Sequence, residues 1–137
     1  MVALTQAGAP VPARSPTVLV VDDNTALQHV ATAMLAAAGI GCCGVNDSIA
    51  ALCALVEHRL HTVLIDADSG PLQTWQFATL VRQHPAHATT RLVYTSTRDD
   101  VIERARALAA GIDTFLAKPF TAEELLAALG TPLEVAA

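Results

Sequence analysis

The stretch TVLID, residues 62–66, is a β-branched apolar run that ends in an aspartate. Similar apolar runs occupy residues 17–21, 92–95 and 114–117, and a weaker, glycine-rich run lies at 40–45. Continuous apolar runs of this length are typical of strands that are buried on both faces of a parallel sheet. The stretch 62–66 and its four counterparts therefore predict five parallel strands.

The segments that follow these runs have the spacing of amphipathic helices. Strand and helix alternate five times, which predicts an α/β fold: a doubly wound parallel sheet of five strands with helices on both faces. The helices are expected over 25–38, from a cap at Ser48, over 72–83, from Asp99 or Asp100, and from the capping box TAEE at 121–124. Their expected apolar residues are, helix by helix, Leu27, Val30, Met34 and Leu35; Ile49, Leu52 and Val56; Leu72, Leu80 and Val81; Val101, Ile102, Ala105 and Leu108; and Leu125, Leu126 and Leu129.

Length and composition restrict the class of protein. The 137 residues suit one domain, expected at 17–130 between a flexible N-terminal tail or linker at 1–16 and a short C-terminal tail at 131–137. The net charge of -5 argues against binding to nucleic acid or to an anionic membrane, both of which require a basic surface. The three cysteines match neither a disulfide framework nor a zinc site, which favours the reducing cytoplasm.

Polar side chains gather where the expected strands end. Asp22 and Asp23 follow the first strand, Asp66 ends the third, hydroxyls at 95–97 end the fourth, and Lys118 follows the fifth. In open α/β sheets, ligands bind beyond the carboxyl ends of the strands. Clustered carboxylates repel one another unless a cation lies between them, and Mg²⁺ prefers oxygen ligands, including those of phosphate. With a lysine and a hydroxyl nearby, the sequence predicts magnesium-assisted phosphoryl chemistry and a carboxylate as the candidate nucleophile.

These residues carry a resemblance to a known family. VVDDN at 20–24, ID at 65–66, Ser96 and FLAKPF at 115–120 resemble, in order and spacing, the receiver domain of two-component response regulators. The resemblance extends over 17–129 and implies a flavodoxin-like fold of five strand–helix units, (βα)5. It also implies a phosphorylation-dependent switch and not an enzyme.

The resemblance implies a role for each residue at the strand ends. Asp66 is the expected phosphoacceptor, modified by a partner histidine kinase or phosphotransfer protein. Mg²⁺ is expected on the carboxylates of Asp22, Asp23 and Asp66 and on the backbone carbonyl of Asp68. Lys118 is expected to bind the phosphoryl group.

The resemblance also implies the parts of a switch. Ser96 is the expected hydroxyl that binds the phosphoryl group, with Thr95 and Thr97 as weaker alternatives. Phe115 matches the aromatic side chain whose rotamer follows phosphorylation, and the Lys118–Pro119 bond is expected to be cis. A downstream protein partner is then expected to bind the face between the fourth and fifth helices.

One loop departs from the family pattern. Residues 67–71 read ADSGP, where the family usually has a Met-Pro pair and then Asp-Gly. Asp68 adds a negative charge where the family places a side chain facing the phosphoryl group. We therefore expect it to disfavour the phosphorylated state or change its lifetime, unless Asp68 itself helps to hold the metal. The departure leaves a second hypothesis open: a pseudo-receiver that is not phosphorylated and serves as a protein-interaction module.

A third hypothesis is a magnesium-dependent phosphatase, since such enzymes also use an aspartate at a strand end with a second acid two residues later, as in Asp66 and Asp68. Because only residues 130–137 follow the fifth helix, we expect no output domain within this sequence. The alternatives for the whole protein are therefore a stand-alone receiver or the receiver of a hybrid histidine kinase.

Overall fold

The computed structural model describes residues 16–130, in which strands and helices alternate along the chain. The expected tails at 1–16 and 131–137 lie outside this range apart from Pro16. Among the described residues, no helix combines the length and the apolar character that a membrane crossing requires. The strands are β1 (Val18–Val21), β2 (Cys42–Val45), β3 (Thr62–Asp66), β4 (Arg91–Ser96) and β5 (Thr114–Ala117). The helices are α1 (Thr25–Ala37), α2 (Ser48–Glu57), α3 (Thr74–Gln83), the short 3-10 helix η1 (Pro85–His87), α4 (Val101–Ala110) and α5 (Ala122–Ala128).

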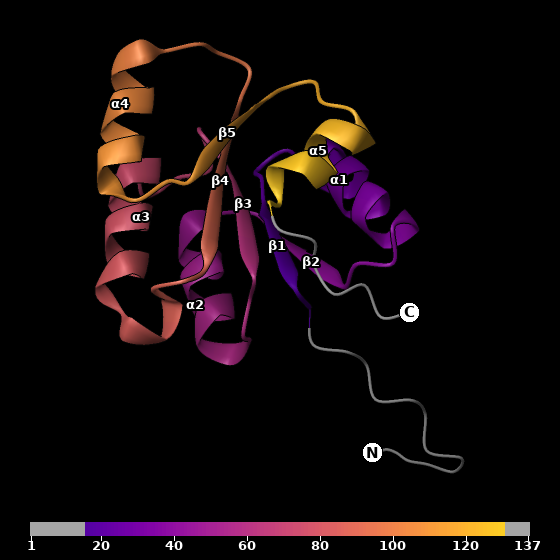
Figure 1. Cartoon of the computed structure of the whole chain (residues 1–137), viewed down its shortest axis with the longest axis horizontal. Helices are drawn as coiled ribbons and strands as arrows, with labels where there is room; N and C mark the ends of the chain where they lie inside the picture. Colours follow the sequence, from indigo (N-terminus) through magenta and orange to yellow (C-terminus); the bar gives the residue numbers. More distant parts are fainter. Residues whose placement is uncertain (1–15, 131–137) are drawn as a thin grey trace.

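Within the described residues, the strands form one parallel sheet in the order β2-β1-β3-β4-β5. Helices α1 and α5 cover one face of this sheet, and α2, α3 and α4 cover the other (Figure 1). The predicted doubly wound, five-stranded α/β fold is confirmed. The strand order also places β1 and β3 side by side at the centre, so the residues that end these two strands lie close together.

Alternate residues of each strand face the two helical layers. Leu19 and Ile65 belong to the core under α2, α3 and α4, whereas Val20 and Leu64 belong to the core under α1 and α5. All four side chains are at most 3% exposed. Because both faces of the sheet are buried, the central strands are apolar at nearly every position, which is why continuous apolar runs predicted them.

Several helix residues that were predicted to face the core are exposed. In α2, Ile49 and Val56 are 45% and 84% exposed, whereas Ala51 and Ala54 are buried. This helix is apolar around most of its circumference, so the spacing of its large residues did not determine which face packs on the sheet. Leu27, Val30, Leu80, Val101, Ile102, Leu108 and Leu126 are also exposed, while Leu35, Val81, Leu125 and Leu129 are buried as expected.

Two helices begin differently from the prediction. The N-cap of α2 is Asp47, whose carboxylate accepts a hydrogen bond from the backbone N–H of Ala50 at 2.8 Å. Ser48, the predicted cap, is buried, and its hydroxyl accepts a hydrogen bond from the backbone N–H of Leu72 at 2.9 Å. That bond holds Leu72 in the loop after β3, and α3 begins only at Thr74. The caps predicted at Asp100 and Thr121 are confirmed.

Candidate functional site

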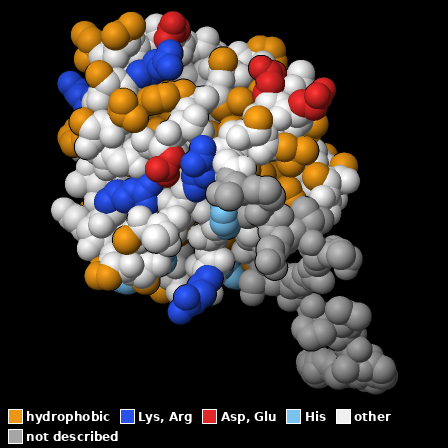
Figure 2. Space-filling view, in the orientation of Figure 1, with side chains coloured by type: hydrophobic (Ala, Val, Ile, Leu, Met, Phe, Trp, Pro, Cys, Tyr) orange, Lys and Arg blue, Asp and Glu red, His pale blue; other side chains and the backbone are white. Residues whose placement is uncertain are grey.

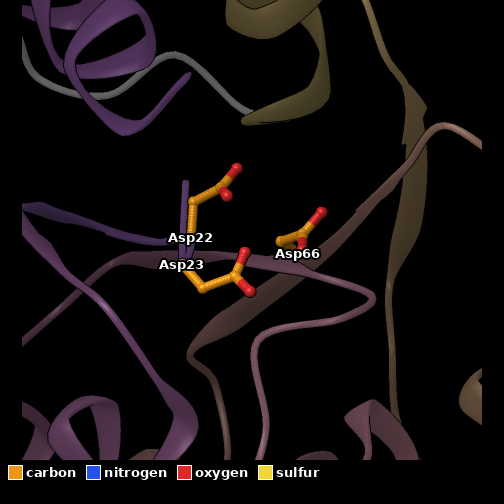
Figure 3. A group of neighbouring side chains, drawn as sticks. All are labelled: Asp22, Asp23 and Asp66. Atoms are coloured by element: carbon orange, nitrogen blue, oxygen red, sulfur yellow. The ribbon is translucent and has the colours of Figure 1, made fainter. Parts of the chain in front are cut away.

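Three carboxylates meet at the carboxyl ends of β1 and β3. Asp22 directly follows β1, Asp23 is next to it, and Asp66 is the last residue of β3. Each offers an oxygen, and these atoms all lie within 4.8 Å of one another. Figure 3 shows the three side chains projecting into one space at the strand ends. Asp22 and Asp66 are 5% and 7% exposed, whereas Asp23 is open to solvent.

Lys118 reaches this cluster from the carboxyl end of the edge strand. It follows β5, and its Nζ donates to Asp22 Oδ2 and to Asp66 Oδ1, both at 2.6 Å. Burial disfavours the ammonium ion, but the hydrogen bonds and the negative charges of the two aspartates outweigh burial and raise the pKa of Lys118 above its ordinary value. The lysine is therefore a fixed positive charge in the site. The expected cis Lys118–Pro119 bond is present.

Gln28 fixes the backbone that carries the first acid. Its side-chain amide, on a residue 7% exposed, donates to the carbonyl of Asp22 at 3.2 Å, to the carbonyl of Val45 at 2.8 Å and to Asn46 Oδ1 at 3.0 Å. The side chain lies over Gly44, where a Cβ atom would come within 2.3 Å of Gln28 Oε1. Gln28 therefore joins the β1–α1 turn to the end of β2.

Ser96 ends β4 next to Lys118. The backbone N–H of Lys118 donates to the carbonyl of Ser96 at 2.9 Å, and the Ser96 hydroxyl accepts a hydrogen bond from the backbone N–H of Arg98 at 3.0 Å. Of the three hydroxyls considered, Thr97 is exposed, while Thr95 and Ser96 are 4% and 9% exposed. The Ser96 hydroxyl at the strand end thus accepts a hydrogen bond from a backbone amide, and its own proton is free to donate.

Phe115 lies in a groove of about 300 Å³ between β5 and the β4–α4 loop. Its ring meets the ring of Tyr94 edge-on, with centroids 5.5 Å apart. The guanidinium carbon of Arg104 lies 4.7 Å from the centre of the Phe115 ring, and Arg104 also forms an ion pair with Asp99 at 2.9 Å. The aromatic side chain is half-buried, and Arg104 covers its open side.

The atypical loop after β3 is tied to both neighbouring segments. The Ser69 hydroxyl donates to the carbonyl of Asp66 at 2.7 Å, and the backbone N–H of Ser48 in α2 donates to the carbonyls of Ser69 and Gly70. The backbone N–H of Asp68 donates to Asp66 Oδ2 at 3.1 Å, but the Asp68 carboxylate is exposed and forms an ion pair with Arg98 at 2.7 Å. The extra negative charge that the sequence predicted beside the site is therefore balanced by an arginine.

A family model described as "response regulator receiver domain" matches residues 18–130 of this chain, nearly all of the part that the structure describes. The chain belongs to the receiver domain family.

Curated relatives and solved structures agree with this membership. The receiver is 27% identical to Protein PilG of Pseudomonas aeruginosa over 112 residues, which are 82% of this chain and 83% of PilG. It is 28% identical to the transcriptional regulatory protein HprR of Escherichia coli over 80% of this chain, but it spans only 48% of HprR. The chemotaxis response regulator CheY4 of Vibrio cholerae has the same fold, with a TM-score of 0.78, 24% identity, and coverage of 85% of this chain and 97% of CheY4.

The receiver domain of the sensor histidine kinase PA1611 of Pseudomonas aeruginosa matches with a TM-score of 0.75 and 25% identity, over 86% of this chain and all of that one. That structure has a magnesium ion coordinated in its active site cleft. In the present receiver, the three strand-end carboxylates face a single ammonium group, so negative charge is in excess. Carboxylate oxygens in excess of the local positive charge fit Mg²⁺, a hard cation that takes oxygen ligands.

Sequence reasoning missed three side chains around this receiver site: Gln28, Arg98 and Arg104. Gln28 did leave a signal, because it lies three and seven residues before the buried Ala31 and Leu35, a polar residue on an inward helical stripe. The two arginines left none, since their partners depend on the path of the β4–α4 loop.

Proposed function

We propose that this receiver accepts a phosphoryl group on Asp66 from the phosphohistidine of a partner histidine kinase or phosphotransfer protein. A carboxylate oxygen of Asp66 forms the new bond to phosphorus as the bond between phosphorus and the histidine nitrogen breaks. The observation that carries the proposal is the position of Asp66: it ends a central strand, is nearly buried, and lies against Lys118 and within 4.8 Å of two further carboxylates.

Asp22, Asp23 and Asp66, with the backbone carbonyl of Asp68, would hold Mg²⁺. When bound, this ion supplies positive charge that offsets the charge of the transferring phosphoryl group. Lys118 now divides its ammonium group between Asp22 and Asp66. Conversion of Asp66 to an acyl phosphate places new anionic oxygens beside Lys118, which then binds the phosphoryl group in place of the carboxylate.

Ser96 and Phe115 would convert this modification into a change of surface. The Ser96 hydroxyl turns to the phosphoryl oxygen, and Phe115 moves into the space that the hydroxyl leaves. The face between α4 and α5 then binds a downstream protein. Helix α4 exposes Val101, Ile102 and Leu108, and hydrophobic side chains gather over its position at the upper left of Figure 2. The receiver is thus a cytoplasmic signalling module that is itself modified, and not an enzyme with a separate substrate.

Incubation with acetyl phosphate and Mg²⁺, followed by intact-mass measurement, tests the proposal. We expect a gain of one phosphoryl group that requires Mg²⁺ and is lost in Asp66→Asn, while Asp68→Asn retains it. No gain, and no response of Trp75 fluorescence to beryllofluoride at millimolar Mg²⁺, would identify a pseudo-receiver. Multiple turnovers of a phosphate ester would identify a phosphatase.

A further inference from the structure

Asp68 and Arg98 link the phosphoacceptor to the switch hydroxyl. Asp68 lies in the loop after β3, and its backbone N–H donates to Asp66 Oδ2 at 3.1 Å. Arg98 lies in the loop after β4, and its backbone N–H donates to the Ser96 hydroxyl at 3.0 Å. The side chains of these two residues then pair with each other at 2.7 Å. The result is a continuous chain of contacts from Asp66 through Asp68 and Arg98 to Ser96.

The ion pair itself contributes little to folding. Both side chains are 61% exposed, and exposed pairs of this kind are screened by water and salt. The arginine is therefore free to change partner at low cost. Its guanidinium group is planar and can bind two oxygens of one phosphoryl group at once.

We propose that Arg98 is a second cation for phosphorylated Asp66, and that Asp68 holds it in reserve beside the unmodified site. This inference rests on the proposed phosphorylation of Asp66. An acyl phosphate presents more negative charge and more acceptor oxygens than the single carboxylate of Asp68, so Arg98 leaves Asp68 for the phosphoryl group. Asp68 acts as the competitor that returns Arg98 when the phosphoryl group is lost.

The same movement would reach the switch surface. Arg98 lines the groove that also contains Phe115 and Arg104, and its backbone amide is bonded to the hydroxyl that has to turn toward the phosphoryl group. A shift of Arg98 toward Asp66 thus opens this groove as the Ser96 hydroxyl leaves its amide partner. Arg98 is a positioning residue in this respect, and a direct ligand of the phosphoryl group in the modified state.

The test measures the affinity for beryllofluoride in Mg²⁺ and the lifetime of the acyl phosphate in four proteins: wild type, Arg98→Gln, Asp68→Asn and the double variant. We expect Arg98→Gln to weaken binding and shorten the lifetime by about fivefold, and Asp68→Asn to do the opposite by about threefold. In the double variant, the gain from Asp68→Asn disappears, because it requires a free Arg98. High salt should reduce all these differences.

Arg106→Gln is the matched control, since Arg106 is similarly exposed and lies on α4, where it pairs with Glu103 at 3.7 Å. Its guanidinium carbon also lies 5.6 Å from the centre of the Trp75 ring, so binding is not followed by Trp75 fluorescence in this comparison. Arg106→Gln should leave both quantities unchanged. If the gain from Asp68→Asn persists without Arg98, Asp68 acts by simple repulsion and the proposal is wrong. It is also wrong if Arg98→Gln behaves like wild type. Wild-type protein that fails to bind beryllofluoride would overturn the proposed function, and this inference with it.

Discussion

Each end of the sheet has a basic side chain with several partners, but the partners differ in kind between the two ends. At the carboxyl ends of the strands, Lys118 binds two carboxylates in a cluster of three. At the amino ends, Arg82 donates to the carbonyls of Gly111 and Thr90 and to the carboxylate of Asp113. The first region carries excess negative charge, whereas the second is balanced and uses its donors on the backbone.

We call the carboxyl end of the strands, which carries the candidate site, the functional end, and the amino end the structural end. Arg82 fills the space over Gly111, which ends α4 with a φ of 119° and where a Cβ atom would lie 2.7 Å from the Arg82 side chain. Asp113 accepts from both Arg82 and the backbone N–H of Leu92 at 2.8 Å. A network that is already satisfied has nothing further to bind, while the opposite end still has unmatched charge.

The largest loss of stability is expected from Arg82→Ala. The change removes hydrogen bonds that join α3, the α4–β5 turn and the start of β4, and it leaves carbonyls and Asp113 without this partner. We expect the free energy of unfolding to fall by about 2–4 kcal/mol, because bonds with a charged donor are lost at half-buried positions. Urea unfolding followed by circular dichroism measures the loss.

Arg106→Ala provides the comparison for that experiment, since Arg106 forms a longer, exposed pair with Glu103. Its expected effect is about 0.5 kcal/mol or less. Equal losses in the two variants would show that the Arg82 network does not stabilise the amino end. The folded fraction of Arg82→Ala should still accept a phosphoryl group, because the hydrogen bonds of Arg82 do not involve the carboxylate cluster or Lys118.

The next largest effect is expected from Lys118→Met measured without Mg²⁺. The change leaves Asp22 and Asp66 buried with no cation, which should cost about 2 kcal/mol in the free energy of unfolding. Millimolar Mg²⁺ should then stabilise the variant more than it stabilises the wild type, because the ion now provides all the positive charge.

Urea unfolding in EDTA and in Mg²⁺ separates the effect of the lysine charge from the effect of the bound ion. Lys118→Arg is the control variant, because it keeps the charge. If Mg²⁺ stabilises wild type and Lys118→Met equally, the lysine does not offset the carboxylates as described. We expect Lys118→Met to have a lower free energy of unfolding than the wild type in EDTA, and this difference to disappear in Mg²⁺.

Gly44→Ala should have a smaller effect, also at the functional end. The new Cβ atom would displace the Gln28 side chain and break its bonds to the Asp22 and Val45 carbonyls, at a cost of about 1 kcal/mol. Gln28→Ala should cost a similar amount. In the Gln28→Ala background, Gly44→Ala should be neutral or stabilising, because alanine restricts the unfolded chain. Urea unfolding of the wild type, the two single variants and the double variant tests whether both substitutions act through the same Gln28 hydrogen bonds. Additive losses in the double variant would contradict this prediction.

The sequence predicted the fold and the strand-end residues for the same reason. Asp22, Asp66 and Lys118 each come directly after an apolar run, and a parallel sheet brings such ends to one edge whatever the helices do in detail. The face of α2 could not be predicted in this way, since Ile49 and Ala51 are both apolar and only packing decides between them.

The partners of Gln28 and Arg98 could not be predicted from the sequence for a different reason. Gln28 meets Val45 across 17 residues, and Arg98 meets Asp68 across 30. Such contacts depend on how two loops lie against each other, which no local pattern encodes. The functional contribution of Asp68 was therefore predicted from its charge alone, without the arginine that balances that charge.

The smallest expected effect concerns His61, at the amino end of the sheet. Burial, and then the positive charge of Arg91, lower the pKa of His61 below its ordinary value. A lowered pKa means that the folded state resists protonation more than the unfolded chain does. The stability that depends on neutral His61 is thus complete above about pH 6.5 and is lost as the pH falls through the folded-state pKa. Solvent screens this half-buried ring, so the loss should be about 0.3 kcal/mol.

An NMR titration of the His61 ring measures that pKa directly. Arg91→Gln should move it toward the ordinary value, because one of the two causes of the shift is removed. Lys118→Met should leave it unchanged, since the charge that it removes lies at the other end of the strands. A pKa at or above the ordinary value in the wild type would contradict the effect assigned here to burial and to Arg91. A response to Lys118→Met would show instead that the two ends are electrostatically coupled, and the separation between them would fail.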